Sequence, residues 1–339
     1  MRRHMMLVLL LLLALSTFTY AGAAQEATPC PPPAEEELES IARQYFDTFN
    51  TGDTDALDEL LAPDYSHDGA IGPEQDRELH KERVRITKAG FPDVQYTIDQ
   101  IMTDGDLVLV RWTFEGTHEG EYAGLAPTGV AVEVTGIHIH RIECGQIVET
   151  WNEGDALALY QQIGLVPTAT GATPATPTDT SSLPMSASPV SCPALTDAEG
   201  QDIVHRWFDE VWSEGNVDGL DEMLTDNHVH HWAIGPDSMG IDQARQRITA
   251  LGETFIDLEM TIDGTLIDGD FVAAWWTATG TAGATLQGMP TNGEPFVLSG
   301  INIFHIECGR IAESWSEADY LGLFRQLGLA PDSAATPSA

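Results

Sequence analysis

The stretch EVTGIHIHRIECGQIVETWN, residues 133–152, returns later in the chain as VLSGINIFHIECGRIAESWS, residues 297–316. Ten of the twenty positions are identical, so the 339-residue chain contains a tandem repeat. In each copy, β-branched residues alternate with polar ones on both sides of a Cys-Gly pair. This pattern is typical of two β-strands joined by a tight turn. We therefore expect each copy to be built around a β-hairpin.

The side chains of this hairpin divide between two faces. Because successive residues of a strand point to opposite sides of a sheet, His138, His140 and Ile142 share one face. On the returning strand, the corresponding face carries Val148, Thr150 and Asn152. We expect these two faces to form the same side of one sheet and to line a pocket.

Helical patterns precede the strands in each copy. Residues 35–52 carry apolar residues at helical spacing and end on Gly52, which can cap a helix. A short helix is expected over residues 55–65, and a third over about 74–89. The solvated face of the third helix is expected to carry Arg83, Arg85 and Lys88.

Strands follow from Val94 to Asn152, and a short helix follows them, with Asp155 as its N-cap. Helices first and a long antiparallel sheet afterwards is an α+β order of elements. We expect the curved sheet to wrap around the N-terminal helices as a cone that encloses a cavity. The second copy repeats every element, at an offset of 163 residues before the third helix and 164 after it.

The segments outside the two copies have a different composition. Residues 1–24 contain two arginines, an apolar run and a group of small residues, which is the pattern of a cleaved signal peptide. The run is short for a transmembrane helix, although an uncleaved anchor is the alternative. Residues 166–195, rich in Thr, Ala and Pro, form an expected linker, and residues 330–339 an expected disordered tail. The two domains are then residues 35–165 and 196–329.

The charge balance excludes two classes of partner. There are 15 Lys and Arg residues against 53 Asp and Glu residues, which gives a formal net charge of −38. Nucleic acid and anionic membrane are therefore poor partners. We interpret the acidity as a solubility feature of an exported, extracytoplasmic protein, with a specific cation-binding role as the alternative.

The four cysteines occupy equivalent places in the two copies. Cys30 and Cys192 precede the first helix of each copy, and Cys144 and Cys308 lie at the hairpin turns. An oxidising compartment favours pairing, and the symmetry of the repeat favours Cys30–Cys144 and Cys192–Cys308 among the three possible connectivities. Neither pair has a second cysteine at the spacing of metal ligands, so no metal is expected at the cysteines.

Residues 105–152, GDLVLVRWTFEGTHEGEYAGLAPTGVAVEVTGIHIHRIECGQIVETWN, and the following ALALYQQIGLV resemble the SnoaL-like polyketide cyclases. The resemblance lies in the strand VRWT, the steps G-T-H and P-T-G, and the ending I-V-E-x-W, and it runs through both copies. It implies two NTF2-like cone domains. It also implies closure of a polyketide ring by intramolecular aldol condensation, without metal or cofactor, on a hydrophobic carbonyl compound. Family members dimerise through the sheet, which the two copies could satisfy within one chain as a pseudo-dimer.

The resemblance further implies an acid/base aspartate on the last strand and a histidine fourteen positions earlier. His138 matches the histidine, but Asn152 stands at the position of the aspartate. In the second copy the two positions carry Asn302 and Ser316. Neither Asn nor Ser titrates near neutral pH, which puts the family chemistry in doubt.

The catalytic candidates are therefore His138, as base or hydrogen-bond donor, and Asn152, as a donor to an enolate oxygen. The alternative is that His138 is a hydrogen-bonding pocket residue without a catalytic task. Glu153 and Glu317 follow the two candidate positions, but strand alternation points them to the opposite face unless a bulge intervenes. Asp155, like its counterpart Asp319, is more economically a helix N-cap.

Further pocket residues are expected around these positions. His67 and its counterpart His230 match a family position near the pocket mouth, with an exposed loop as the alternative. The run His228, His230, His231 is thin support for a metal site, so none is expected. The remaining substrate-binding candidates are Trp112, His140, Trp276, Asn302, Phe304 and Ser316.

Three functions fit these observations. The first is an exported SnoaL-like enzyme, of the polyketide or ester cyclase kind, that acts by acid/base chemistry. The second is a binding protein that kept the cone but lost the chemistry, which Asn152, Ser316 and the secretory signal favour. In the third, the second copy is a structural partner of the first.

Overall fold

The computed structural model describes residues 30–69, 72–167, 192–286, 288–291 and 293–330. The chain divides into an N-terminal unit, residues 1–31, and a compact unit, residues 32–339, which contains both repeats. The expected signal peptide, nearly all of the expected tail and most of the expected linker lie outside the described residues.

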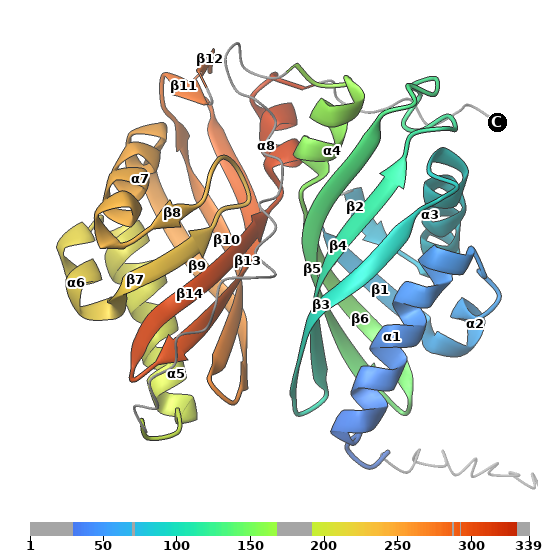
Figure 1. Cartoon of the computed structure of the whole chain (residues 1–339), viewed down its shortest axis with the longest axis horizontal. Coiled ribbons are helices and arrows are strands. Elements are labelled where there is room, and N and C mark those ends of the chain that lie inside the picture. Colours follow the sequence, from blue (N-terminus) through green and yellow to red (C-terminus); the bar gives the residue numbers. More distant parts are fainter. Residues whose placement is uncertain (1–29, 70–71, 168–191, 287, 292, 331–339) are drawn as a thin grey trace, which may run out of the picture. The chain divides into compact units, whose positions relative to one another are not determined.

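Each repeat consists of helices followed by a six-stranded sheet (Figure 1). The first repeat contains α1 (Glu35–Thr51), α2 (Leu57–Leu60), β1 (Leu61–Gly69), β2 (Gly72–Gln75), α3 (Arg77–Gly90), β3 (Gln95–Asp104), β4 (Leu107–Thr117), β5 (Ala131–Glu143), β6 (Gln146–Gly154) and α4 (Ala156–Ile163). The second contains α5 (Asp197–His205), the π-helix η1 (Arg206–Ser213), the 3₁₀-helix η2 (Val217–Gly219), α6 (Leu220–Met223), β7 (Leu224–His231), β8 (Ser238–Met239), α7 (Ile241–Thr254), β9 (Phe255–Asp268), β10 (Phe271–Ala282), β11 (Thr285–Leu286), β12 (Met289–Pro290), β13 (Pro295–Glu307), β14 (Arg310–Ala318) and α8 (Tyr320–Gln326). The expected α+β fold of two domains is confirmed.

The strand order is β2-β1-β6-β5-β4-β3 in the first sheet and β8-β7-β14-β13-β10-β9 in the second. One element differs from the sequence-based expectation. Residues 61–65 do not continue the second helix, because Leu61 takes an extended conformation at its C-cap and begins β1. β1 pairs with β6 in parallel, so the sheet is not wholly antiparallel.

The helices pack on one face of each sheet because their apolar residues recur at helical spacing. In α1, Leu38, Tyr45 and Phe49 are buried, and Gly52 ends the helix with φ +80°. In α3, His80 and Val84 are buried one turn apart. Figure 1 shows α1 and α3 on the same side of the first sheet, and the second repeat is built in the same way.

The hairpin of the first repeat has the predicted pairing over most of its length. His138 lies opposite Asn152, and His140 lies opposite Thr150. Beyond Arg141 the register shifts, so that Ile142 pairs with Ile147 rather than with the Val148 face. Because of this bulge, Ile147 points into the core, and Val148 does not lie on the face that carries Thr150 and Asn152.

The first helix of the second repeat absorbs an extra residue. Trp207 lies eight residues before Gly215, whereas Tyr45 lies seven residues before Gly52. Residues 206–213 form a π-helix, which accommodates one residue more than an α-helix over the same length. The offset between the copies is thus 162 residues at Tyr45 and Trp207, and it becomes the expected 163 only after this helix.

The disulfide between Cys192 and Cys308 ties the start of the second repeat to its last hairpin, with a sequence separation of 116 residues. Cys30 and Cys144 are also disulfide-bonded, and the described residues contain no free cysteine. The pairing predicted from the symmetry of the repeat is confirmed for Cys192 and Cys308.

The two sheets contact each other through the faces that the helices leave uncovered. Thr135 Oγ1 donates a hydrogen bond to Glu317 Oε1 at 2.6 Å, and at the equivalent place Ser299 Oγ donates to Glu153 Oε1 at 2.5 Å. Glu153 and Glu317 therefore point away from the helices, as strand alternation predicts. Between these bonds lies an apolar cluster built from four equivalent pairs of residues: Met102, Leu109, Ile137, Ile139, Leu266, Ala273, Ile301 and Ile303.

At the edge of the contact between the two sheets, the two equivalent places are occupied by different pairs of residues. The guanidinium carbon of Arg111 lies 5.2 Å from the ring centroid of Trp315, which allows a cation–π interaction. At the equivalent place, Trp275 packs against Trp151 with ring centroids 5.5 Å apart. The contact is thus symmetric at its centre and asymmetric at its edge.

Glu317 makes this contact sensitive to pH. Burial and, to a smaller extent, the nearby charge of Asp155 raise the pKa of Glu317 to about 8. The folded chain therefore retains a proton that the unfolded chain releases at a lower pH. The stability contributed by protonated Glu317 is complete below the pKa of the unfolded chain and is lost as the pH rises toward about 8.

We expect Glu317→Gln to remove this pH dependence, because the amide stays neutral and still accepts the hydrogen bond from Thr135. In urea unfolding between pH 5 and pH 9, the variant gains stability relative to the wild type as the pH rises, on the order of a few kcal/mol. Glu259→Gln, at an exposed position, is the matched control. Parallel curves for the wild type and Glu317→Gln would contradict the expectation.

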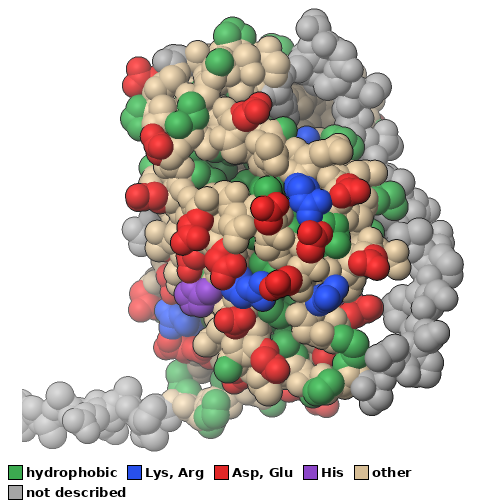
Figure 2. All heavy atoms as spheres, turned by 90° about the vertical axis from the view of Figure 1, so that its left-hand side faces the viewer, with side chains coloured by type: hydrophobic (Ala, Val, Ile, Leu, Met, Phe, Trp, Pro, Cys, Tyr) green, Lys and Arg blue, Asp and Glu red, His purple; other side chains and the backbone are tan. Residues whose placement is uncertain are grey.

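On the face of the second repeat that Figure 2 shows, acidic side chains outnumber basic ones, in keeping with the net charge of −38. A membrane-spanning helix is absent from the described part of the chain, since no helix there is both long and apolar enough.

Candidate functional site

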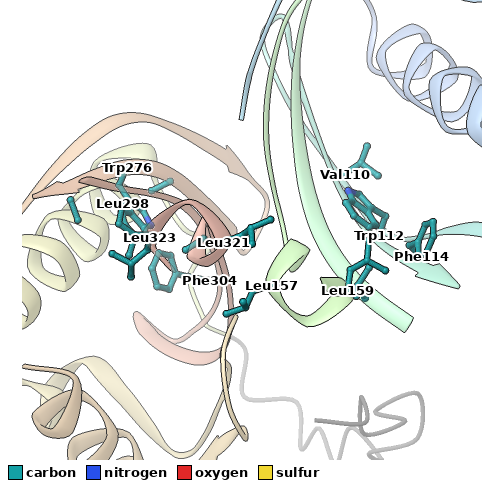
Figure 3. Packing of buried hydrophobic residues seen from close by; sticks show 14 of the residues in the cluster. Val110, Trp112, Phe114, Leu157, Leu159, Trp276, Leu298, Phe304, Leu321 and Leu323 are labelled. Atoms are coloured by element: carbon teal, nitrogen blue, oxygen red, sulfur yellow. The ribbon is translucent and has the colours of Figure 1, made fainter. Parts of the chain in front are cut away.

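The first repeat encloses a cavity between α3, the sheet and α4. Its walls are largely aromatic, with Trp112 on β4, Tyr96 on β3 and Tyr160 on α4 among them. Leu159 of α4 lies beside Trp112 (Figure 3). Leu321 of α8, in the second repeat, also lines the cavity. Besides the tyrosines, the polar residues of this wall are Arg83, Thr87, Asn152 and Asp155. The lining thus combines aromatic faces with a few polar atoms around a cavity volume of about 50 Å³.

A hydrogen-bonded group of Trp112, His138 and Asn152, from β4, β5 and β6, lies at one side of the cavity. Trp112 Nε1 donates a hydrogen bond to His138 Nδ1 at 2.7 Å, and Asn152 Nδ2 lies 3.3 Å from the same nitrogen. Nδ1 must therefore accept, so the neutral ring carries its proton on Nε2. His138 itself does not line the cavity. It lies behind Trp112 and Asn152 and orients both side chains.

Behind the cavity lies a buried cluster of His67, His80, His138 and His140, packed against Tyr45. His67 Nδ1 lies 3.4 Å from His80 Nδ1. Burial lowers the pKa of His67, His80 and His138 well below the ordinary value, and that of His140 to about 3. These imidazoles are therefore neutral at physiological pH.

Two residues of α3 were not expected at this site. His80 is completely buried in the histidine cluster, and its spacing with Val84 and Thr87 is the signal that could have found it. Arg83 lines the cavity, although the sequence suggested a solvated face for it. This expectation was wrong because Arg83 lies one position before buried Val84, at the border of the apolar face of α3.

The second repeat has an equivalent cavity with a different chemical character. Trp276 Nε1 donates to Asn302 Oδ1 at 2.8 Å, so an amide replaces His138. His230 Nε2 lies 3.1 Å from Ser316 Oγ, and burial lowers the pKa of His230 well below its ordinary value. The wall of this second cavity also includes Trp212 and Trp232, which were not predicted.

The cavity walls contain only part of the predicted set. Trp112 and Asn152 line the first cavity. His230, Trp276, Asn302 and Ser316 line the second. His67, His138 and His140 lie behind the first cavity, and Phe304 lies behind the second, packed against Trp207 and Phe208.

The three histidines near residue 230 do not converge. His228 and His230 both contact Ser314 inside the repeat. His231 instead lies between Asp237 and Glu313, at 2.9 and 3.0 Å. Although partial burial lowers it, hydrogen bonds to these two carboxylates raise the pKa of His231 to about 9. Among the described residues, no group of three or more His, Cys, Asp or Glu side chains has the arrangement of a metal site.

Comparison with known proteins gives consistent matches. The family model described as SnoaL-like polyketide cyclase matches residues 39–163 and 202–327. Aklanonic acid methyl ester cyclase AcmA of Streptomyces galilaeus is 28% identical over 133 residues, which are 37% of this chain and 89% of that protein. The corresponding cyclase DnrD of Streptomyces peucetius is 28% identical over 128 residues, 37% of this chain and 88% of that protein.

Among solved structures, TsrD from Streptomyces laurentii is 32% identical, with a TM-score of 0.37, and the match covers 40% of this chain and 98% of that chain. IdmH from Streptomyces antibioticus is 33% identical, with a TM-score of 0.34, and the match covers 37% of this chain and 97% of that chain. Since the family model spans most of both repeats, the chain belongs to the SnoaL-like polyketide cyclase family, in two tandem copies.

Proposed function

We propose that the first repeat catalyses proton transfer, or an aldol-type ring closure, on a hydrophobic carbonyl compound without metal or cofactor. One observation carries the proposal: an oriented amide, Asn152, stands in the aromatic wall of the cavity. Asn152 Nδ2 lies 3.3 Å from His138 Nδ1, and the side chain also interacts with His67, so the amide is oriented by two histidines. A hydrogen of Nδ2 that does not point to His138 can be donated to a ligand oxygen. A donor fixed in this way stabilises the negative charge that develops on an enolate oxygen.

The proposed ring closure conserves all atoms of the substrate. A base removes a proton from a carbon next to a carbonyl group, and the electron pair of the C–H bond forms an enolate. The enolate carbon then bonds to a second carbonyl carbon of the same molecule, whose oxygen takes up the proton. The relatives are named for aklanonic acid methyl ester, so we take this ester as the first test compound.

We assign a binding role without catalysis to the second repeat. Its cavity is lined by indoles, an asparagine and a serine, none of which titrates near neutral pH, and the pKa of His230 is depressed. The alternative, that the whole protein only binds ligands, is supported by the absence of the family aspartate at Asn152. The shared apolar cluster and the equivalent Thr135–Glu317 and Ser299–Glu153 bonds support an intrachain pseudo-dimer.

We further propose that the protein works outside the cytoplasm. Disulfide-bonded cysteines favour an oxidising compartment. The N-terminal residues that would act as the signal peptide lie outside the described residues.

Deuterium exchange tests the catalytic role. The oxidised full chain is incubated in deuterated buffer with aklanonic acid methyl ester and with polycyclic β-dicarbonyl compounds. Tryptophan fluorescence reports binding, and mass spectrometry reports deuterium at the acidic carbon. We expect exchange in the wild type and about a hundredfold slower exchange in Asn152→Leu, which lacks the donor.

Ser316→Ala is the matched control, since Ser316 occupies the position of Asn152 in the second repeat and its loss should leave exchange unchanged. If compounds bind but exchange no faster than in buffer, the protein is a binding relative of the cyclases.

A further inference from the structure

The proposed reaction needs a proton acceptor, and the positions used by the family do not supply one. Asn152 does not titrate. The Nδ1 atom of His138 already accepts hydrogen bonds from Trp112 and Asn152, and its Nε2 carries the proton. Burial also lowers the pKa of His138 well below its ordinary value. Another group in the cavity must take the proton if the proposed function is correct.

Among the described residues that line this cavity, Asp155 alone carries a carboxyl group. It follows Asn152 by three residues, just after the end of β6, and its side chain lines the same wall. Oδ1 accepts a hydrogen bond from the backbone nitrogen of Ala158 at 2.8 Å, which caps α4. Among the described residues, no hydrogen bond reaches Oδ2. One carboxyl oxygen thus holds the side chain in place, and the other is available to a ligand.

The second repeat shows that capping does not require contact with a cavity. Asp319 caps α8 in the same way, with Oδ1 accepting from the nitrogen of Gly322 at 2.7 Å. Its neighbours Ala318 and Tyr320 line the second cavity, but Asp319 does not. The two aspartates share a structural task, and only Asp155 also faces a cavity.

We propose that Asp155 is the general base and acid of the first repeat, in place of the family aspartate. This inference rests on the proposed function. The carboxylate takes the proton from the carbon next to the substrate carbonyl and becomes a carboxylic acid. Asn152 holds the enolate oxygen during this step. After the new carbon–carbon bond forms, Asp155 returns the same proton to the alkoxide oxygen, so the enzyme is regenerated without a co-reactant.

The surroundings of Asp155 fit this task. Burial raises the pKa of Asp155 to about 7, although the hydrogen bond from Ala158 opposes the rise. Such a carboxyl group can both accept and return a proton near neutral pH. The titratable and charged groups around it are Arg83 of α3, Tyr96 of β3, Tyr122, Tyr160 of α4, Glu317 of β14 and Tyr320 of α8. Of these, Glu317 titrates in an overlapping range, so it needs its own control.

The test compares Asp155→Asn with Asp319→Asn in the oxidised full chain. Asparagine caps a helix about as well as aspartate, so both variants keep the cap while losing the titrating group. The readout is the exchange rate of a bound β-dicarbonyl compound between pH 5 and pH 9. In the wild type, we expect the rate to rise with pH as Asp155 ionises near pH 7. Asp155→Asn should lower the rate about a hundredfold and abolish the rise, while binding stays unchanged.

Asp319→Asn and Glu317→Gln should keep both the rate and the rise. If Asp155→Asn exchanges as fast as the wild type while Asn152→Leu is slow, Asp155 is only a cap, and the proposed function stands without it. If the wild type exchanges no bound compound, the proposed function and this inference both fail.

Discussion

Gly136→Ala is expected to slow the proposed proton transfer by the first repeat while leaving the second repeat intact. Gly136 lies opposite Trp112 in the sheet, and the indole ring covers the place that a Cβ atom would occupy. The ring cannot move aside freely, because its Nε1 atom is hydrogen-bonded to buried His138. The added methyl group therefore displaces both the cavity wall and the histidine that orients Asn152. We expect exchange to fall at least about tenfold, with a loss of stability of about 1–3 kcal/mol.

Gly300→Ala is the matched control, because a Cβ atom at Gly300 overlaps Trp276 in the same way. It should cost similar stability in urea unfolding and change ligand binding by the second repeat, but it should leave exchange intact. Wild-type exchange in Gly136→Ala would show that the position of Trp112 does not matter for the chemistry.

Loss of the disulfide between Cys192 and Cys308 is expected to give the largest change in stability. The bond closes a loop with a sequence separation of 116 residues, and release of such a loop costs on the order of 4 kcal/mol, chiefly because the unfolded chain gains freedom. We expect the double variant Cys192→Ser/Cys308→Ser to unfold at clearly lower urea concentration than the oxidised wild type.

The reduced wild type provides the comparison for this variant. Reduction opens every disulfide, so it should destabilise the chain at least as much as the double substitution does. An unchanged unfolding midpoint for the double variant in oxidising buffer would mean that the second repeat does not depend on this bond.

The repeated hairpin predicted the tandem organisation and the pairing of its two strands, because alternation along a strand leaves few arrangements for its faces. The pairing of His138 with Asn152 follows directly from that pattern. β1 was missed for a different reason. Its sequence, with Pro63 and several polar residues, has no alternation, and it is a strand because β6 offers it a parallel partner. Tertiary pairing overrides local pattern at such an edge.

The candidate site was predicted less completely, because the face of a strand does not say how deep a side chain lies. His138 and His140 point to the expected side, but Trp112 and Asn152 lie between His138 and the cavity. The contribution of Leu321, from the other repeat, depends on contacts across the chain that no local pattern contains. The sequence around Asp155 predicted a helix N-cap, which is correct, but it did not indicate that Asp155 also lines the cavity.

The unequal edges of the contact between the repeats have an evolutionary consequence. In a homodimer built around a twofold axis, each substitution occurs twice, so both edges must change together and remain self-complementary. Arg111 against Trp315 and Trp275 against Trp151 are two different solutions at one pair of equivalent places. Covalent linkage makes this possible, because each copy can acquire mutations that its twin does not share. A duplicated gene fused in this way can keep one chemistry in one half and evolve a different ligand in the other.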